Sequence, residues 1–201
     1  MKKFVLVLGI FALIAPLMAQ TETSSPQKEE KKEKPKKKKK AKLDLTNALI
    51  IGQLDNAEDR YSLEINLTEM FTSNGVKSIP SLNIMKLGSD AIILESDSVK
   101  QLMASKGIDT YVLVSVRGYD RRFKVTDRRD DLQTALSAAG LFDLFRADIV
   151  SISFEFKFYR NGEYVHGDMI KCGNISDRET VLKRFRSKVT KRLTKKWIPK
   201  R

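Results

Sequence analysis

IVSISFEFKFYRNGEYVHGDMI, residues 149–170, is the stretch that decides the fold of this 201-residue chain. Polar and apolar residues alternate from Ser151 to Phe158, which is the period-2 pattern of a strand with one buried face. Asn161-Gly162 follows, and this pair favours a type I′ turn because both central residues of such a turn need positive φ. The stretch therefore predicts a long β-hairpin. The predicted buried residues of its first strand are Ile152, Phe154, Phe156 and Phe158.

A two-residue loop fixes the register of a hairpin, so the partner of each residue can be counted from the turn. Phe158 then faces Val165, and Lys157 faces His166. The predicted core face consists of Phe154, Phe156, Phe158, Val165 and Met169. The predicted water-facing side consists of Glu155, Lys157, Tyr159, Tyr164, His166 and Asp168. Burying each large apolar side chain is worth roughly 1.5–3 kcal/mol, so a slip of one residue would cost most of the core.

The residues before the hairpin alternate between strand and helix patterns. Crossover helices between strands imply a parallel or mixed sheet. Pro80 cannot donate a ladder hydrogen bond, so the strand that contains it belongs at an edge or at a bulge. The predicted order is strand 48–52, helix 55–74, strand 76–85, helix 96–107, strand 111–116, polar excursion 117–131 and a short helix within 130–145 that breaks at Gly140.

A basic helix closes the chain. Ser176-Asp177-Arg178-Glu179 has the spacing of a capping box and predicts a helix to about Trp197. Its apolar stripe is Leu182, Phe185, Val189 and Leu193. We therefore predict one α/β (or α+β) domain over residues 43–201, with a mixed sheet of about five strands, the long hairpin, and helices packed on the sheet.

The amino-terminal residues have the layout of an export signal. Lys2 and Lys3 precede an apolar run and a small residue at Ala19, so residues 1–19 are predicted to be a signal peptide of bacterial type. An uncleaved membrane anchor is the alternative, although the run is shorter than the ~20 residues of a spanning helix. Residues 20–42 contain almost no apolar side chain and are predicted to form a disordered Lys-rich linker.

Charge is concentrated at the two ends. Residues 28–42 contain ten lysines and three glutamates, and residues 177–201 contain eleven basic and two acidic residues. Residues 44–176 carry a net charge of −4. The single cysteine, Cys172, rules out an intramolecular disulfide, and we favour a buried strand-end thiol over pairing with a partner.

Catalytic and cofactor motifs are absent from the sequence. It contains no Gly-x-Gly-x-x-Gly, no phosphate-binding loop and no Gly-x-Ser-x-Gly elbow, and its only histidine is His166. Glu155, His166 and Asp168 share a face in the predicted register, which allows a metal or acid–base site, but a polar strand surface is the favoured interpretation. We predict no enzymatic activity, no metal and no cofactor.

The basic ends are the predicted binding surfaces, because lysine clusters adhere to anionic surfaces. A solvated spacer is an equally favoured interpretation of the Lys-rich linker. Residues 117–129 interleave aromatic and basic residues, but aspartates interrupt them, so nucleic-acid binding is not predicted. The candidate anion or partner surface consists of Lys36, Lys37, Lys38, Lys39, Lys40, Arg184, Lys188, Lys191 and Lys195.

Three stretches together resemble the small α/β domains of bacterial envelope proteins and lipoproteins, including the amino-terminal domain of TolB. They are ALIIG at 48–52, GVKSIPS at 75–81 and GIDTYVLV at 107–114, followed by the hairpin and the closing helix. The resemblance implies an envelope binding or accessory role over residues 45–197. It transfers no functional residue, and the cleavage-site cysteine of lipidated members is missing here.

The expected function is therefore that of a non-enzymatic, exported protein of the periplasm or outer envelope surface that docks to an envelope assembly. The alternative is a protein that binds anionic lipid, lipopolysaccharide or another polyanion through the Lys-rich tail and the basic closing helix. The sequence does not specify the oligomeric state.

Overall fold

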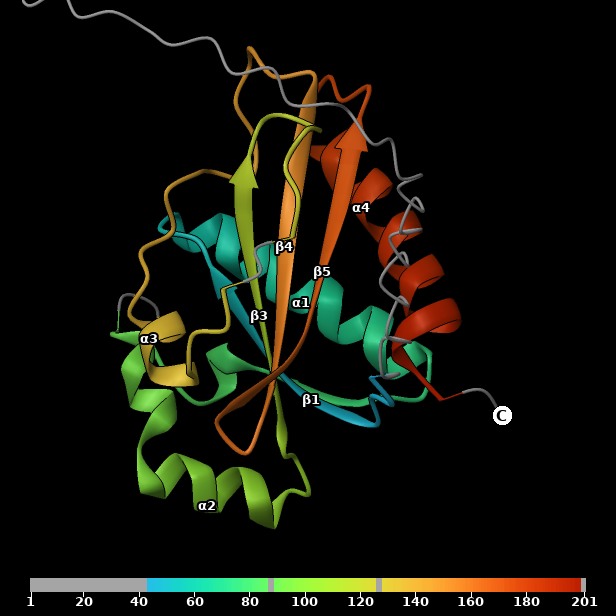
Figure 1. Ribbon diagram of the computed structural model, residues 1–201. Coiled ribbons are helices and arrows are strands. Elements are labelled where there is room, and N and C mark those ends of the chain that lie inside the picture. The colour runs from blue at the N-terminus through green and yellow to red at the C-terminus, as the bar shows by residue number, and fades with distance from the viewer. Residues whose placement is uncertain (1–42, 87–88, 126–127, 200–201) are drawn as a thin grey trace, which may run out of the picture. The chain divides into compact units, whose positions relative to one another are not determined.

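The structure is a computed structural model that describes residues 43–86, 89–125 and 128–199. These residues form a mixed five-stranded sheet with helices on both faces (Figure 1), which confirms the predicted single α/β domain. The predicted signal peptide, residues 1–19, and the predicted linker, residues 20–42, lie outside the described residues. Within the described ranges, no helix combines the length and the apolar character that crossing a membrane requires.

The sheet has the strand order β2-β1-β3-β4-β5. β1 runs parallel to β2 and β3, whereas β3, β4 and β5 are antiparallel neighbours. The parallel pairs follow from the crossover helices, and the antiparallel pair β4–β5 follows from the tight turn. β2 and β5 are therefore the edges of the sheet. The strand bounds are β1 Asn47–Gln53, β2 Lys77–Pro80, β3 Thr110–Gly118, β4 Ser151–Arg160 and β5 Glu163–Gly173.

Two predicted elements are shorter than expected. The predicted strand 76–85 ends at Pro80, at the sheet edge as Pro80 suggested, and continues as the 3-10 turn Ser81–Asn83. The helix predicted within 130–145 keeps only one turn. The helices are α1 Ala57–Ser73, α2 Asp97–Ser105, α3 Leu132–Leu136 and α4 Arg178–Arg192, with a 3-10 turn at Ala91–Glu95 and a π-helical turn at Leu193–Trp197.

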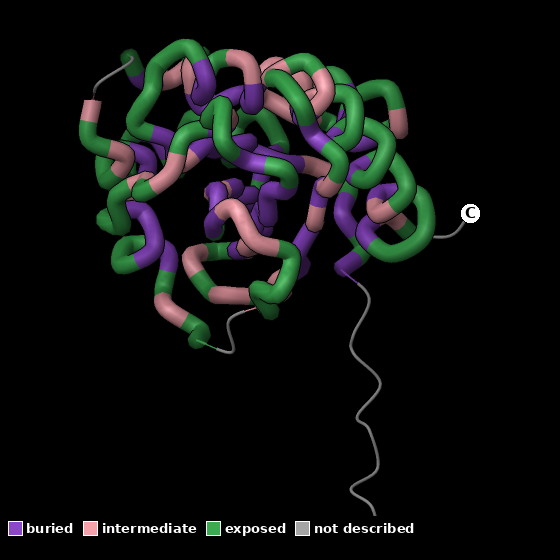
Figure 2. The backbone as a smooth tube through the Cα atoms, turned by 90° about the horizontal axis from the view of Figure 1, so that it is seen from above, coloured by how far each residue is buried: buried purple, intermediate pink, exposed green. Residues whose placement is uncertain are grey.

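The two faces of the sheet carry separate cores. α1 and α4 cover one face, which includes the three phenylalanines of β4, and α2 and α3 cover the other (Figure 1). Figure 2 shows buried residues gathered in the interior and exposed segments around them. The Phe154, Phe156 and Phe158 side chains are fully buried, and their rings lie near Phe185 or Trp197. The predicted core role is confirmed for the phenylalanines of β4, whereas Met169 pairs with Glu155 and lies on the opposite face.

The predicted hairpin register is correct for the two residue pairs next to the turn and wrong beyond them. Asn161 and Gly162 have φ of 52° and 82°, as the turn requires, and Tyr159 pairs with Tyr164. A β-bulge then shifts the ladder, so that Phe158 pairs with His166 instead of Val165. Val165 is consequently 42% exposed.

The predicted water-facing side of the hairpin is also wrong, because residues 119–125, residues 128–131 and α3 lie over it. Tyr159 is fully buried among residues of α2 and α3, and Glu155 is 3% exposed. Asp130 forms an ion pair with Lys157 at 3.8 Å, and the Leu132 N–H donates to the carbonyl of Gly162 at 3.2 Å.

The N-caps of α1 and α4 lie one residue beyond the first residues of their predicted capping motifs, Asp55 and Ser176. The N-cap of α1 is Asn56, whose side chain accepts from the Asp59 N–H, and that of α4 is Asp177, which accepts from the Thr180 N–H at 2.6 Å. These bonds satisfy amides that the first helical turn leaves unpaired.

Candidate anion-binding groove

A groove of about 670 Å³ lies between β5 and α4. Seven of its ten lining residues are basic, and none is acidic. Figure 1 shows α4 beside β5, which is the edge strand of the sheet. The lining residues are Arg121, Met169, Ile170, Lys171, Ser187, Lys188, Lys191, Arg192, Lys195 and Lys196.

The wall formed by α4 follows from the amphipathic pattern of this helix. Phe185 and Val189 are fully buried against the sheet, so the residues beside this stripe border the groove. Lys188 and Lys195 are seven residues apart, which corresponds to about 10 Å along a helix axis. The groove therefore carries a row of positive charges rather than a single one.

The opposite wall belongs to β5 and to the segment after β3. Lys171 donates from its Nζ to the main-chain carbonyl of Arg121, and this contact places both residues on the same side of β5. A Cβ atom placed on Gly173 would lie 3.2 Å from Arg121 Cδ. The Arg121 side chain thus lies across the end of β5, where the absence of a side chain at Gly173 leaves room for it.

The charges in the groove are only partly neutralised by the protein itself. Arg192 is 3.5 Å from the Asp168 carboxylate, which is buried at the base of α4. Within residues 43–86, 89–125 and 128–199, Lys188, Lys191, Lys195 and Lys196 form no ion pair. Such clustering of like charge without counter-charge favours binding of an anion.

The structure brings together only part of the predicted surface. Lys188, Lys191 and Lys195 line the groove, whereas Arg184 lies on α4 without lining it. Lys36, Lys37, Lys38, Lys39 and Lys40 lie outside the described residues. Sequence reasoning missed Arg121, Lys171, Arg192 and Lys196. Arg192 and Lys196 could have been included, since they are basic residues of the predicted helix. Arg121 and Lys171 reach the groove only through the packing of segments that are distant in sequence.

The predicted polar face of Glu155, His166 and Asp168 does not exist, because the β-bulge separates its members. Asp168 pairs with Phe156 on β4 and therefore shares the face of the phenylalanines, as does His166, whose ring lies 5.9 Å from that of Phe158. Glu155 points to the opposite face, where its carboxylate is 3.9 Å from Arg117. In the described part of the chain, no three histidine, cysteine, aspartate or glutamate side chains gather as metal ligands would.

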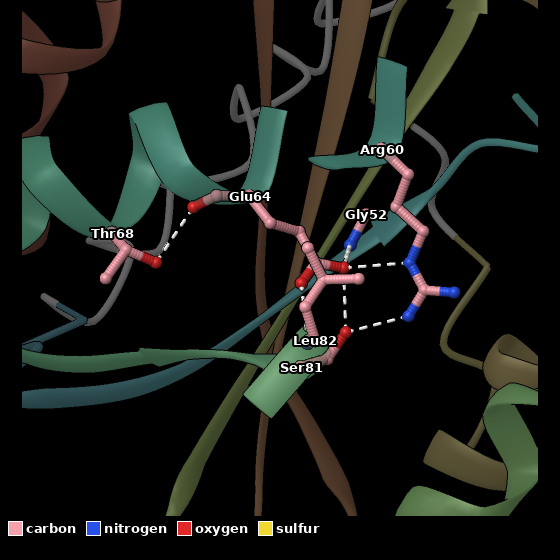
Figure 3. Close-up of polar contacts among 6 residues, drawn as sticks. All are labelled: Gly52, Arg60, Glu64, Thr68, Ser81 and Leu82. Atoms are coloured by element: carbon pink, nitrogen blue, oxygen red, sulfur yellow. Dashed lines mark hydrogen bonds and ion pairs between the residues drawn. The ribbon is translucent and has the colours of Figure 1, made fainter. Parts of the chain in front are cut away.

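The most buried charged cluster lies away from the groove, at the end of β1 (Figure 3). The fully buried Glu64 carboxylate accepts hydrogen bonds from the Gly52 N–H at 2.9 Å and the Leu82 N–H at 3.1 Å. The same carboxylate accepts from the Ser81 hydroxyl at 2.7 Å and from Arg60 Nε at 3.0 Å. Its oxygens are thus occupied by α1, β1 and the turn after β2, so this carboxylate joins three elements and is not placed to act on a substrate.

Two further hollows are less distinctive. One of about 530 Å³ lies at the end of β1, where open α/β sheets commonly bind ligands, but it mixes Arg60 with Asp55 and Asp90. Another of about 540 Å³ lies between α2 and the hairpin turn. Neither has the uniform charge of the groove between β5 and α4.

Comparisons with known proteins give likeness of fold only. No protein-family model matches the chain, and no curated protein matches its sequence. The PelC dodecamer from Paraburkholderia phytofirmans is similar in structure, with 12% identity over 79% of this chain and 92% of that chain and a TM-score of 0.42. Lipoprotein GNA1162 from Neisseria meningitidis is also similar in structure, with 11% identity over 74% of this chain and 97% of that chain and a TM-score of 0.40. Likenesses at this level carry no argument for function, and neither protein is a TolB domain, so the TolB resemblance stays a prediction.

Proposed function

We propose that this protein is a non-enzymatic binding module of the bacterial cell envelope that docks onto an envelope assembly through the groove between β5 and α4. The observation that carries the proposal is the lining of this groove, with seven basic and no acidic residues. None of its five lysines has an ion-pair partner in the described residues, so an anionic partner would relieve their mutual repulsion.

The location rests on the sequence. The signal-like residues 1–19 direct the chain out of the cytoplasm, and the Lys-rich residues 28–42 then act as a basic tether ahead of the folded domain. The periplasm or the outer envelope surface is the proposed site of action.

Envelope fractionation at increasing salt tests this proposal. The double variant Lys191→Glu/Lys195→Glu reverses two groove charges, and we expect it to be released from the envelope fraction at lower salt than the original chain. Lys183→Glu/Lys106→Glu is the matched control, because both lysines are exposed and neither lines the groove. Equal release of both double variants would refute docking through the groove.

Adhesion to anionic lipid is the second candidate, favoured by the exposure of Lys191, Lys195 and Lys196 on one side of the molecule. Vesicles with and without phosphatidylglycerol separate the two functions. Binding to charged vesicles, together with failure to capture any protein from envelope extracts, would favour the lipid. Deleting residues 20–42 in both assays shows whether the tether adheres or only spaces.

A further inference from the structure

We propose that the groove receives an extended acidic segment of a partner protein, which adds to the sheet as a strand beside β5. This inference rests on the proposed docking function and names the kind of partner that the groove recognises. It follows from three properties of the groove: its position at a strand edge, the direction of the edge amides, and the placement of cations on both sides of that edge.

The groove follows the open edge of β5. Met169, Ile170 and Lys171 are consecutive strand residues, and all three line it. Consecutive side chains of a strand point to opposite faces of the sheet, so a hollow bordered by all three must reach around the edge. β5 pairs only with β4 among the described strands, which leaves this edge without a strand neighbour.

The backbone of β5 offers hydrogen-bonding groups at this edge. The Met169 N–H donates to the Asp168 carboxylate at 2.8 Å, so it points away from β4. Every second residue of an antiparallel strand bonds to the same side, so Lys171 also presents its N–H and C=O to the groove. Asp168 already satisfies the amide of Met169, which leaves Lys171 as the residue that pairs with an incoming strand.

Cations flank the edge on both sides. Lys188, Lys191 and Lys195 come from α4, on the face of the phenylalanines, while Lys171 and Arg121 lie on the opposite face. A docked strand would direct its side chains alternately to these two faces, so acidic residues at both odd and even positions would meet a cation. Main-chain hydrogen bonds at this edge select a polypeptide, because a lipid headgroup or a sugar has no peptide backbone to form them.

Positive charge disfavours segments of this chain itself as occupants of the groove. Residues 28–42 carry ten lysines and three glutamates and would be repelled by the groove. If a second copy paired edge to edge through β5, the Lys171 side chains of the two copies would approach and repel each other. The occupant is therefore an acidic segment of another protein.

Fluorescence anisotropy with two designed peptides tests this inference. The probe is a labelled peptide of about ten residues in which pairs of glutamates are separated by threonine or valine, so that both faces carry acidic side chains, and its control is the same peptide with an N-methyl group on every backbone amide. Methylation keeps the charge but removes strand pairing, so we expect binding about tenfold weaker. Lys171→Glu/Lys191→Glu should abolish binding of the probe, whereas Lys183→Glu/Lys106→Glu should retain it.

Hydrogen exchange provides a second readout, with protection of the amide of Lys171 expected only with the unmethylated peptide. Equal affinity for both peptides, without protection of β5, would overturn strand addition and leave docking by charge intact. Binding of phosphatidylglycerol vesicles but of neither peptide would overturn the inference in favour of lipid. Binding of no anion by the folded protein would refute the proposed function as well. Circular dichroism confirms that each variant is folded.

Discussion

The indole Nε1 of Trp197 donates a hydrogen bond to the Asp168 carboxylate at 3.1 Å, joining the turn after α4 to the edge strand β5. Arg192 lies 3.5 Å from the same carboxylate oxygen. The other oxygen accepts from the Met169 N–H. This buried carboxylate thus links the end of α4 and the turn after it to β5, beside the basic groove.

Replacing Asp168 by alanine should therefore destabilise the closing helix. The change leaves the indole N–H and the Met169 amide without their acceptor in a buried setting, and each such loss costs about 1–3 kcal/mol. Asp168→Asn should cost less, because an amide oxygen still accepts. Trp197 is the only tryptophan of the chain and is fully buried, so its fluorescence during urea unfolding measures the effect directly. An Asp168→Ala variant as stable as the original would contradict this assignment.

The buried Glu64 carboxylate is expected to contribute more to the free energy of unfolding than the Asp168 carboxylate. Glu64→Gln places an amide NH₂ where four donors already converge, so we expect a loss of about 3–5 kcal/mol. Glu69→Gln on the same helix is the matched control, since Glu69 is exposed and forms a surface ion pair with Arg186. That change should cost less than about 1 kcal/mol. Denaturant midpoints of the two variants give the comparison, and similar midpoints would count against a structural role for Glu64.

The bulged register predicts opposite responses at two hairpin residues. Val165 is 42% exposed, so Val165→Thr should change the free energy of unfolding by less than about 0.5 kcal/mol. Phe158 is fully buried against Trp197, so Phe158→Ala should cost about 3–5 kcal/mol. A large loss from Val165→Thr would instead favour the unbulged register, in which Val165 faces Phe158.

Cys172 predicts a change of stability at alkaline pH. Burial raises the pKa of its thiol from 9.0 to about 11, against the smaller opposing influence of Lys188 and Arg184. The folded state therefore keeps a proton that the unfolded chain loses above pH 9. The stabilisation is complete below pH 9 and is lost as the pH rises through about 11.

Unfolding measured between pH 8 and pH 11 checks this expectation. The stability of Cys172→Ala should fall less steeply with pH than that of the original chain, even if its stability at pH 8 is lower. Parallel curves for the two proteins would show that the thiol does not contribute. In the folded state at neutral pH, the thiol should also react with disulfide reagents only after denaturant is added.

The parts of the fold that local chemistry determines were predictable from the sequence. The phenylalanine face of β4, the Asn161-Gly162 turn and the apolar stripe of α4 are patterns within one element, and the structure confirms them. The bulge at Val165 has no such signature, and one extra residue reversed the faces assigned to His166 and Asp168.

The candidate groove was predictable only in part, for a related reason. Its α4 wall follows from helical periodicity, which placed Lys188, Lys191 and Lys195 together. The other wall depends on how the segment after β3 lies against β5, and periodicity carries no information about such packing. The sequence therefore predicts only a polar excursion around Arg121 and not its position beside the closing helix.

The contacts of Trp197 with the start of the described chain and with β4 also bear on when the fold can be completed during synthesis. The Leu45 N–H donates to the carbonyl of Trp197 at 2.7 Å, and the indole of Trp197 lies against Phe156 and Phe158. A nascent chain that has completed the sheet still lacks the ring that closes the core over it, until translation has passed residue 197. The growing chain therefore remains incompletely folded until nearly all of the described residues have left the ribosome.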